Sequence, residues 1–105
     1  MDNYQIIDKW VTALETKGEG GYFNRKDKNI NFSDDTIYSY GNHFKMAQVI
    51  GGIVFFNTGK YSRTTTQHQS MLNGRLHASS LQVVYLPFER NITVPIGLEQ
   101  KVAVG

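Results

Sequence analysis

The sequence of 105 residues contains no cysteine. Disulfides, thiolate nucleophiles and zinc-thiolate sites are therefore excluded, and a reducing compartment is compatible with the chain. The sequence also lacks a run of about 18 apolar residues, the length that a membrane-spanning helix needs. Its first ten residues, MDNYQIIDKW, carry acids where a secretory signal carries cations. We therefore expect a cytoplasmic protein that does not bind membranes.

Acidic side chains are absent from residues 36–88. This middle segment holds four cations: Lys45, Lys60, Arg63 and Arg75. Because the net charge of the whole chain is only +2, the two ends are together acidic. A basic face of this kind attracts phosphate groups or an acidic protein surface. The alternative is that the four cations are scattered over a solvated surface.

Hydrophobic residues make up 40% of the chain and aromatic residues 12%, as in ordinary folded proteins. The length allows one hydrophobic core, so we expect a single domain over residues 1–105. Apolar residues recur at helical spacing from a cap at Asp2 or Asn3 to a stop at Gly18. A second helix is predicted from Thr65 to His77.

Short strands are predicted in the segments YFNRKD, NINFS, TIYSYG, HFKMAQVI, IVFFNT and LQVVYLPF. The last residues either add a strand near NITVPI or trail loosely. Gly51 and Gly52 lie between two apolar segments and suit a type I′ turn, so a hairpin is predicted there. Both of its strands are apolar at nearly every position, which is typical of a central hairpin covered on both faces. The sum is an α+β fold with an antiparallel sheet, a central hairpin and two helices.

The hydroxyl-rich sequence TTTQ fits a capping box, in which Thr64 accepts from the amide of Gln67 and the Gln67 side chain reaches back. His68 falls on the apolar side of this helix, so it is expected to point inward. The plainest interpretation is a buried, hydrogen-bonded histidine. The functional alternative is an anion bound at the helix start by amides, hydroxyls and cations. The residues available for it are Lys60, Ser62, Arg63, Thr64 and Thr65.

Tyrosines lie among the same cations. Tyr38, Tyr40 and Tyr61, together with Lys45, Lys60 and Arg63, would form a stacking platform for unpaired bases. Tyrosines in strands more often pack against neighbouring strands, and that interpretation is favoured.

Histidines offer two enzymatic hypotheses. The triplets HQS at His68 and HAS at His77 are similar to twin phosphoesterase motifs, but nine helical residues put the two rings on opposite faces. A pair of His43 and His68 near Lys60 or Arg63 would instead serve a metal-independent ribonuclease. Three dispersed histidines in an acid-free region do not suit a metal, and no cofactor is expected.

The segment from Tyr38 to Ser70 resembles an uncharacterised small domain that recurs in bacteriophage genomes. Its signature reads approximately Tyr-x-Tyr-Gly-x-His-Phe, then an apolar hairpin, then Asn and a turn leading to Tyr-Ser-x-Thr-Thr-x-x-His-Gln. The matching positions are Tyr38, Tyr40, Gly41, His43, Phe44, Asn57, Tyr61, Ser62, Thr64, Thr65, His68 and Gln69. The resemblance implies a phage or prophage origin and joins His43 and His68 in one signature, but it brings no activity with it.

Small phage proteins without a catalytic signature often act by binding, and inhibitors of host defence are a prominent class of them. We therefore expect a non-enzymatic inhibitor of a host nucleic-acid-targeting defence system, similar to an anti-CRISPR protein. Its partner would be a defence protein or ribonucleoprotein, contacted by Lys45, Lys60, Arg63 and Arg75. The alternatives are direct binding of RNA or DNA and, less favoured, the paired-histidine ribonuclease. Homodimerisation through an unpaired sheet edge is compatible with this fold, although the sequence does not identify the edge.

Overall fold

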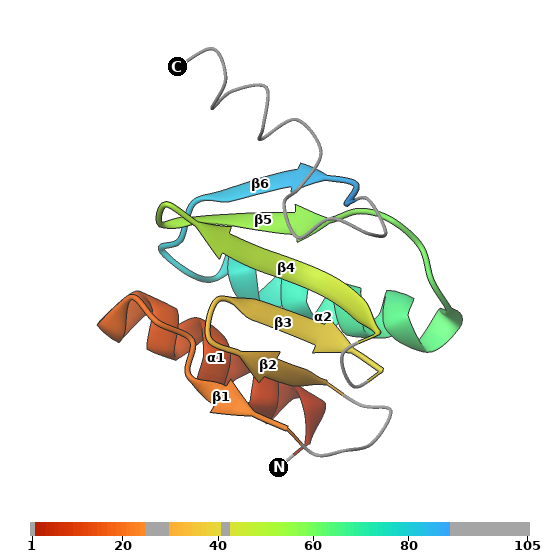
Figure 1. Ribbon diagram of the computed structural model, residues 1–105, viewed down its shortest axis with the longest axis horizontal. Helices are drawn as coiled ribbons and strands as arrows, with labels where there is room; N and C mark the ends of the chain where they lie inside the picture. Colours follow the sequence, from red (N-terminus) through yellow and green to blue (C-terminus); the bar gives the residue numbers. More distant parts are fainter. Residues whose placement is uncertain (1, 25–29, 41–42, 89–105) are drawn as a thin grey trace.

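The computed structural model describes residues 2–24, 30–40 and 43–88 and has the expected α+β architecture (Figure 1). Two helices accompany a six-stranded, mostly antiparallel sheet. In chain order the elements are α1 (Asn3–Lys17), β1 (Tyr22–Phe23), β2 (Asn31–Ser33), β3 (Thr36–Ser39), β4 (Phe44–Ile50), β5 (Ile53–Asn57), α2 (Arg63–His77) and β6 (Val83–Leu86).

The strands lie side by side in the order in which they occur in the chain, from β1 to β6. The first four pairings are antiparallel, as the short connections between these strands require. The last pairing, β5 with β6, is parallel. The reason is α2, which carries the chain back along the sheet before β6 begins, so that β6 runs in the direction of β5. The predicted α+β fold with an antiparallel sheet is thus confirmed, and the parallel β5–β6 pairing is a detail that the sequence did not predict.

The helix α1 begins and ends as the sequence predicts. Asp2 is its N-cap and accepts from the backbone amide of Gln5 at 2.8 Å, while the Gln5 side chain accepts from the Asp2 amide at 2.9 Å. This reciprocal pair is a capping box. At the other end Gly18 adopts the left-handed conformation, with φ 75°, that terminates helices.

The β4–β5 hairpin lies in the middle of the sheet, with Gly51 and Gly52 at φ 60° and 80° in its turn. Two successive positive φ values are those of a type I′ turn, which explains the two glycines. Both helices pack on the same face of the sheet (Figure 1). The two helices therefore cover one face of the hairpin, whereas the sequence predicted cover on both faces; every position of β4 and β5 is nevertheless buried or half-buried.

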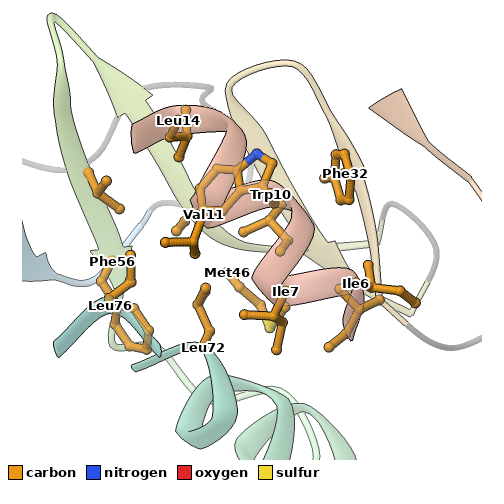
Figure 2. Close-up of a cluster of buried hydrophobic side chains, with 14 residues drawn as sticks. Ile6, Ile7, Trp10, Val11, Leu14, Phe32, Met46, Phe56, Leu72 and Leu76 are labelled. Atoms are coloured by element: carbon orange, nitrogen blue, oxygen red, sulfur yellow. The ribbon is translucent and has the colours of Figure 1, made fainter. Parts of the chain in front are cut away.

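The hydrophobic core lies between that face and the two helices, as Figure 2 shows. Trp10 of α1 is fully buried at its centre, and its indole N–H donates to the carbonyl of Asp34 at 3.1 Å. The other buried members shared by helices and sheet are Ile6, Ile7, Val11, Leu14, Ile30, Phe32, Ile37, Met46, Ala47, Val54, Phe56, Leu72 and Leu76.

The start of α2 differs from the prediction. Its N-cap is Ser62, whose hydroxyl accepts from the amide of Thr65 at 3.1 Å. Thr64 lies within the helix and is exposed, so the capping box proposed for Thr64 and Gln67 is wrong. Ser62 takes the role because its backbone is extended, with φ −154°, as an N-cap residue requires. Thr64 already lies inside the helix, so it cannot be the N-cap.

Two sequence hypotheses fall on segments that the structure does not describe. They are the second half of the YFNRKD strand, over residues 25–27, and the alternative strand near NITVPI, over residues 91–96. Among the described residues, neither helix has the length and apolar character needed to cross a bilayer.

Candidate binding surface at the start of the second helix

The loop between β5 and α2 is held in place by two buried amide side chains. Asn57 donates through Nδ2 to the carbonyl of Lys45 at 2.8 Å, and its Oδ1 accepts from the amide of Gly59 at 2.9 Å. Gln69 of α2 donates through Nε2 to the carbonyls of Asn57 and Gly59, at 2.8 and 2.9 Å. Because these bonds fix both ends of residues 57–59, Lys60 and Tyr61 are presented from a rigid support.

Tyr61 is 56% exposed, yet its ring is held by two aromatic neighbours. Its ring stacks on Phe44 with centroids 5.5 Å apart, and Tyr40 meets it edge to face at 5.6 Å. Such aromatic pairs stabilise by about 0.5–1.5 kcal/mol beyond the area that they bury. The consequence is a fixed, half-exposed aromatic ring at the molecular surface.

Tyr40 contributes a second sign of local constraint, because its φ is 59°. The left-handed conformation is unfavourable for a side chain with a Cβ by about 1–2 kcal/mol. Residues held in such conformations concentrate at binding and catalytic sites. Here the conformation accompanies the tight connection from β3 to β4, which brings Tyr40 against Tyr61 of a distant segment.

Lys60 and Arg63 flank Tyr61 in the chain, and both are exposed. Within the described part of the chain neither of them forms an ion pair. The exposed Thr64 follows, and the amides of Arg63 and Thr64 belong to the first helical turn, where amides have no acceptor within the helix. We call the four exposed residues Lys60, Tyr61, Arg63 and Thr64 the Tyr61 surface. It combines an aromatic ring, positive charge and free hydrogen-bond donors.

Directly beneath this surface lies a buried polar network. Thr65 is fully buried, and its hydroxyl lies 3.2 Å from that of Ser62 and 3.0 Å from that of Ser39 on β3. The Ser39 hydroxyl is in turn 2.8 Å from Nδ1 of His68. On the other side of the ring, Asn3 of α1 bonds to Nε2 at 3.2 Å. Ser62 and Thr65, predicted as ligand contacts, therefore serve the fold.

His68 is only 3% exposed, and both of its ring nitrogens are engaged. Since the Asn3 side-chain N–H₂ can only donate, Nε2 is the acceptor and Nδ1 carries the proton, which it donates to Ser39. Burial lowers the pKa of His68 because the charged imidazolium would lose its hydration. The ring is accordingly neutral and occupied, as the plainer sequence interpretation predicts.

His43 lies three residues after Tyr40, is exposed, and its amide donates to the Tyr40 carbonyl at 3.1 Å. His43 therefore lies in the connection between β3 and β4, next to Tyr40, whose ring packs against Tyr61. A ribonuclease mechanism also needs His68 to exchange a proton with a substrate, and a buried ring with both nitrogens bonded does not provide that. We assign His68 to positioning β3, α1 and α2. His77, on the opposite side of α2, is exposed and stacks on Tyr85.

Lys45 and Tyr38 are register partners on β4 and β3. Side chains alternate along a strand, so Lys45 points away from Phe44, which packs toward the helices and Tyr61. Lys45 and Tyr38 are thus directed to the other face of the sheet. The stacking platform expected from three tyrosines and three cations is reduced to Tyr40 and Tyr61 with Lys60 and Arg63.

Arg75 does not belong to the Tyr61 surface. It lies near the end of α2 rather than at its start, and its side chain is only 14% exposed. The guanidinium donates through Nε to Asp8 at 2.7 Å and through an Nη atom to Glu15 at 3.1 Å, both on α1. The hydrogen bonds to Asp8 and Glu15 raise the pKa of Arg75. The backbone amide of Ser80 and the Arg75 guanidinium, which both donate to the Glu15 carboxylate, lower the pKa of Glu15. The basic face predicted from four cations is corrected accordingly, since Arg75 clamps the two helices together.

The amide side chains that position the site, Asn3, Asn57 and Gln69, were not predicted from the sequence to do so; Asn3 was considered only as a cap of the first helix. Only the fold shows that Asn57 and Gln69 meet, because eleven residues of loop and helix lie between them. Asn3 lies 65 residues from its partner His68, and no local pattern marks such a contact.

No protein-family model, curated protein or solved structure matches this chain. Within the described residues, no group of three histidine, aspartate or glutamate side chains is arranged to hold a metal ion.

Proposed function

We propose that the protein acts by binding, without catalysis, and that the Tyr61 surface is its contact site. The observation that carries this proposal is the half-exposed Tyr61 ring, fixed by Phe44 and Tyr40 and flanked in the chain by Lys60 and Arg63, which form no ion pair with any described residue. Fixed aromatic residues and arginines are the side chains that most often dominate binding energy at interfaces. A rigid ring also loses little conformational entropy when a partner covers it.

The partner that we propose is a host nucleic-acid-targeting defence complex, which the phage protein would inhibit in the host cytoplasm. Two considerations support this choice. The resemblance of residues 38–70 to a phage domain points to a function directed at the host. The Tyr61 surface carries positive charge and an exposed ring, so it suits an acidic or apolar patch on a nuclease, or the nucleic acid bound to it, rather than a surface that normally holds DNA through its own cations.

Affinity capture from host cells tests this proposal. Tagged wild-type protein should retain the defence complex, and the complex should remain bound after digestion with nuclease. The double change Tyr61→Ala and Arg63→Glu should reduce recovery at least about tenfold, the effect of losing about 1.4 kcal/mol of binding energy. Tyr22→Ala is the matched control, because Tyr22 is 69% exposed on β1, at the far edge of the sheet. Equal recovery by wild type and the double variant would refute the Tyr61 surface as the contact.

Direct binding of single-stranded RNA or DNA is the second candidate, and it is favoured by the same exposed ring next to two cations. Bases stack on such rings in proteins that bind unpaired strands. Titration into labelled oligonucleotides at low and moderate salt, with a chelator present, separates the two candidates. A nucleic-acid binder loses affinity as salt rises, because phosphate contacts release counterions. Strand integrity measured in the same samples reports whether any cleavage occurs.

A further inference from the structure

Among the described strands, none pairs with the outer edge of β6, so this edge of the sheet carries unused backbone groups. β6 pairs with β5 on one side only. The carbonyls of Gln82 and Leu86 accept from Val54 and Thr58 on that side, at 2.9 and 3.1 Å. In a parallel ladder alternate residues face the same neighbour, so Val83 and Tyr85 direct their N–H and C=O groups outward. In the part of the chain that the structure describes, those outward groups have no hydrogen-bond partner.

Within its four residues this edge lacks two of the features by which proteins prevent strand addition, charge and proline, although Pro87 follows the strand directly. β6 has the sequence VVYL, with no charge and no proline inside the strand. Tyr85 does not cover the edge, because its ring packs on Phe56 and its hydroxyl donates to Asn73 of α2 at 2.7 Å. A neutral edge whose outward backbone groups are unpaired among the described residues is a template for another strand. The opposite edge, β1, offers only two residues.

We propose that β6 is a homodimer interface, in which two copies of this chain pair antiparallel along their β6 edges and form one continuous sheet. The pairing is self-complementary about a twofold axis through Val84. Val83 of one copy lies opposite Tyr85 of the other, and each such pair exchanges two backbone hydrogen bonds, which gives four in total. An isologous contact of this type needs no second surface, so it closes at two copies.

The side chains fit the same register. Val83 and Tyr85 face the helices, since Val83 packs against the core and Tyr85 against Phe56. Across the twofold axis each Tyr85 ring then lies beside the Val83 of its partner copy, a pairing of aromatic and β-branched residues that stabilises sheets. The two copies of Val84 meet on the other face, and because the strand carries no charge, no repulsion opposes the contact.

Sedimentation velocity on the full chain, up to about 1 mM so that a weak dimer is detected, tests the oligomeric state. Wild type should show a dimer fraction that rises with concentration. Val84→Lys places two like charges directly opposite each other and should weaken the dimer at least about tenfold. Val84→Thr keeps a neutral β-branched residue and should retain it. Circular dichroism and the melting temperature of each variant report whether the monomer still folds.

A cysteine reporter gives an independent readout, because the chain has no cysteine of its own. The two copies of Val84 form a non-hydrogen-bonded pair with Cα atoms about 4.5 Å apart, which is within the range that a disulfide bridges. Val84→Cys should therefore form a disulfide-linked dimer under mild oxidation much faster than Tyr22→Cys on the β1 edge. The proposal is overturned by a monomer at every concentration with equal crosslinking of the two variants. It is also overturned by a dimer that Val84→Lys leaves intact.

Discussion

At the scale of single residues, His68 shows how a side chain suited to catalysis serves the fold. Its ring connects α1 through Asn3 and β3 through Ser39 to the helix on which it lies. α1, β3 and α2 lie far apart in the sequence, so the ring of His68 joins three distant segments of the chain. The Ser39 hydroxyl is also hydrogen-bonded to the hydroxyl of Thr65, which lies directly beneath the Tyr61 surface.

His68→Ala should lower the free energy of unfolding by about 2–4 kcal/mol, because it opens a cavity and removes one of the two hydrogen-bond partners of the buried Ser39 hydroxyl, leaving only Thr65. Ser39→Ala should cost less, about 1–2 kcal/mol. The two effects should not add, since both changes break the same bond. Urea unfolding of both single variants and the double variant measures the coupling. Strict additivity would contradict the network.

The pH dependence of stability follows from the same residue. Burial lowers the pKa of His68 below its ordinary value of 6.5, so between the two values the unfolded chain binds more protons than the folded chain. The stabilisation is complete above pH 6.5 and is lost as the pH falls toward the folded pKa. Urea unfolding at about pH 7.5 and pH 5.5 should therefore show a larger decrease for wild type than for His68→Gln. An equal decrease would mean that other groups carry the effect.

At the scale of elements, the sequence predicted what local patterns determine. Apolar spacing and Gly18 defined α1, and Gly51 with Gly52 defined the central hairpin. It missed the parallel pairing of β5 with β6, because pairing direction depends on where α2 returns the chain. The sequence prediction also placed the N-cap of α2 at Thr64. Several adjacent residues carry hydroxyls that could cap the helix, and only the extended backbone of Ser62 shows which of them does so.

The hairpin turn offers a direct test at this scale. Gly51 has φ 60° with nothing near its Cβ position, so Gly51→Ala should destabilise through backbone strain alone, by about 1–2 kcal/mol. Gly51→Asn should cost less, because asparagine tolerates the left-handed conformation. Thermal unfolding of both variants measures the difference. Equal melting temperatures for the alanine and asparagine variants would contradict the assigned turn.

The clamp between the helices gives a second test, which separates Arg75 from the binding surface. Arg75→Ala should lower the melting temperature by a few degrees, because the hydrogen bonds that join α2 to Asp8 and Glu15 of α1 are lost. Recovery of the partner in affinity capture should stay unchanged. A loss of partner comparable to that of Arg63→Ala, at a temperature where the protein is folded, would return Arg75 to the contact surface.

At the scale of the whole molecule, charge in the chain did not translate directly into a charged face. Four cations in an acid-free segment suggested one basic surface, yet folding separates them. Lys60 and Arg63 stay together at the start of α2, Lys45 points to the other face of the sheet, and α1 supplies acids that neutralise Arg75. The sequence thus predicted the loop in which the candidate site lies. It did not predict which residues form the site, because that depends on the alternation of side chains along the strands and on contacts between distant segments.

A dimer through β6 would present two Tyr61 surfaces on one particle. Two contacts on a multisubunit partner strengthen binding without any new interaction, provided that both can be engaged at once. The wild-type protein should therefore bind such a partner more tightly than Val84→Lys, although Val84 lies outside the Tyr61 surface. Surface plasmon resonance with the partner at high and low density measures this difference, which should vanish at low density.

The proposed function is tested most directly by protection of a targeted plasmid in bacteria. The protein is expressed in strains that each carry one active RNA-guided nuclease, and the transformation efficiency of a plasmid that the nuclease targets is measured. Wild type and Tyr22→Ala should raise that efficiency at least about tenfold in a susceptible strain, and the Tyr61→Ala, Arg63→Glu double variant should not, although it melts at the wild-type temperature. Equal protection by the double variant, or no protection by wild type in any strain, would contradict the account.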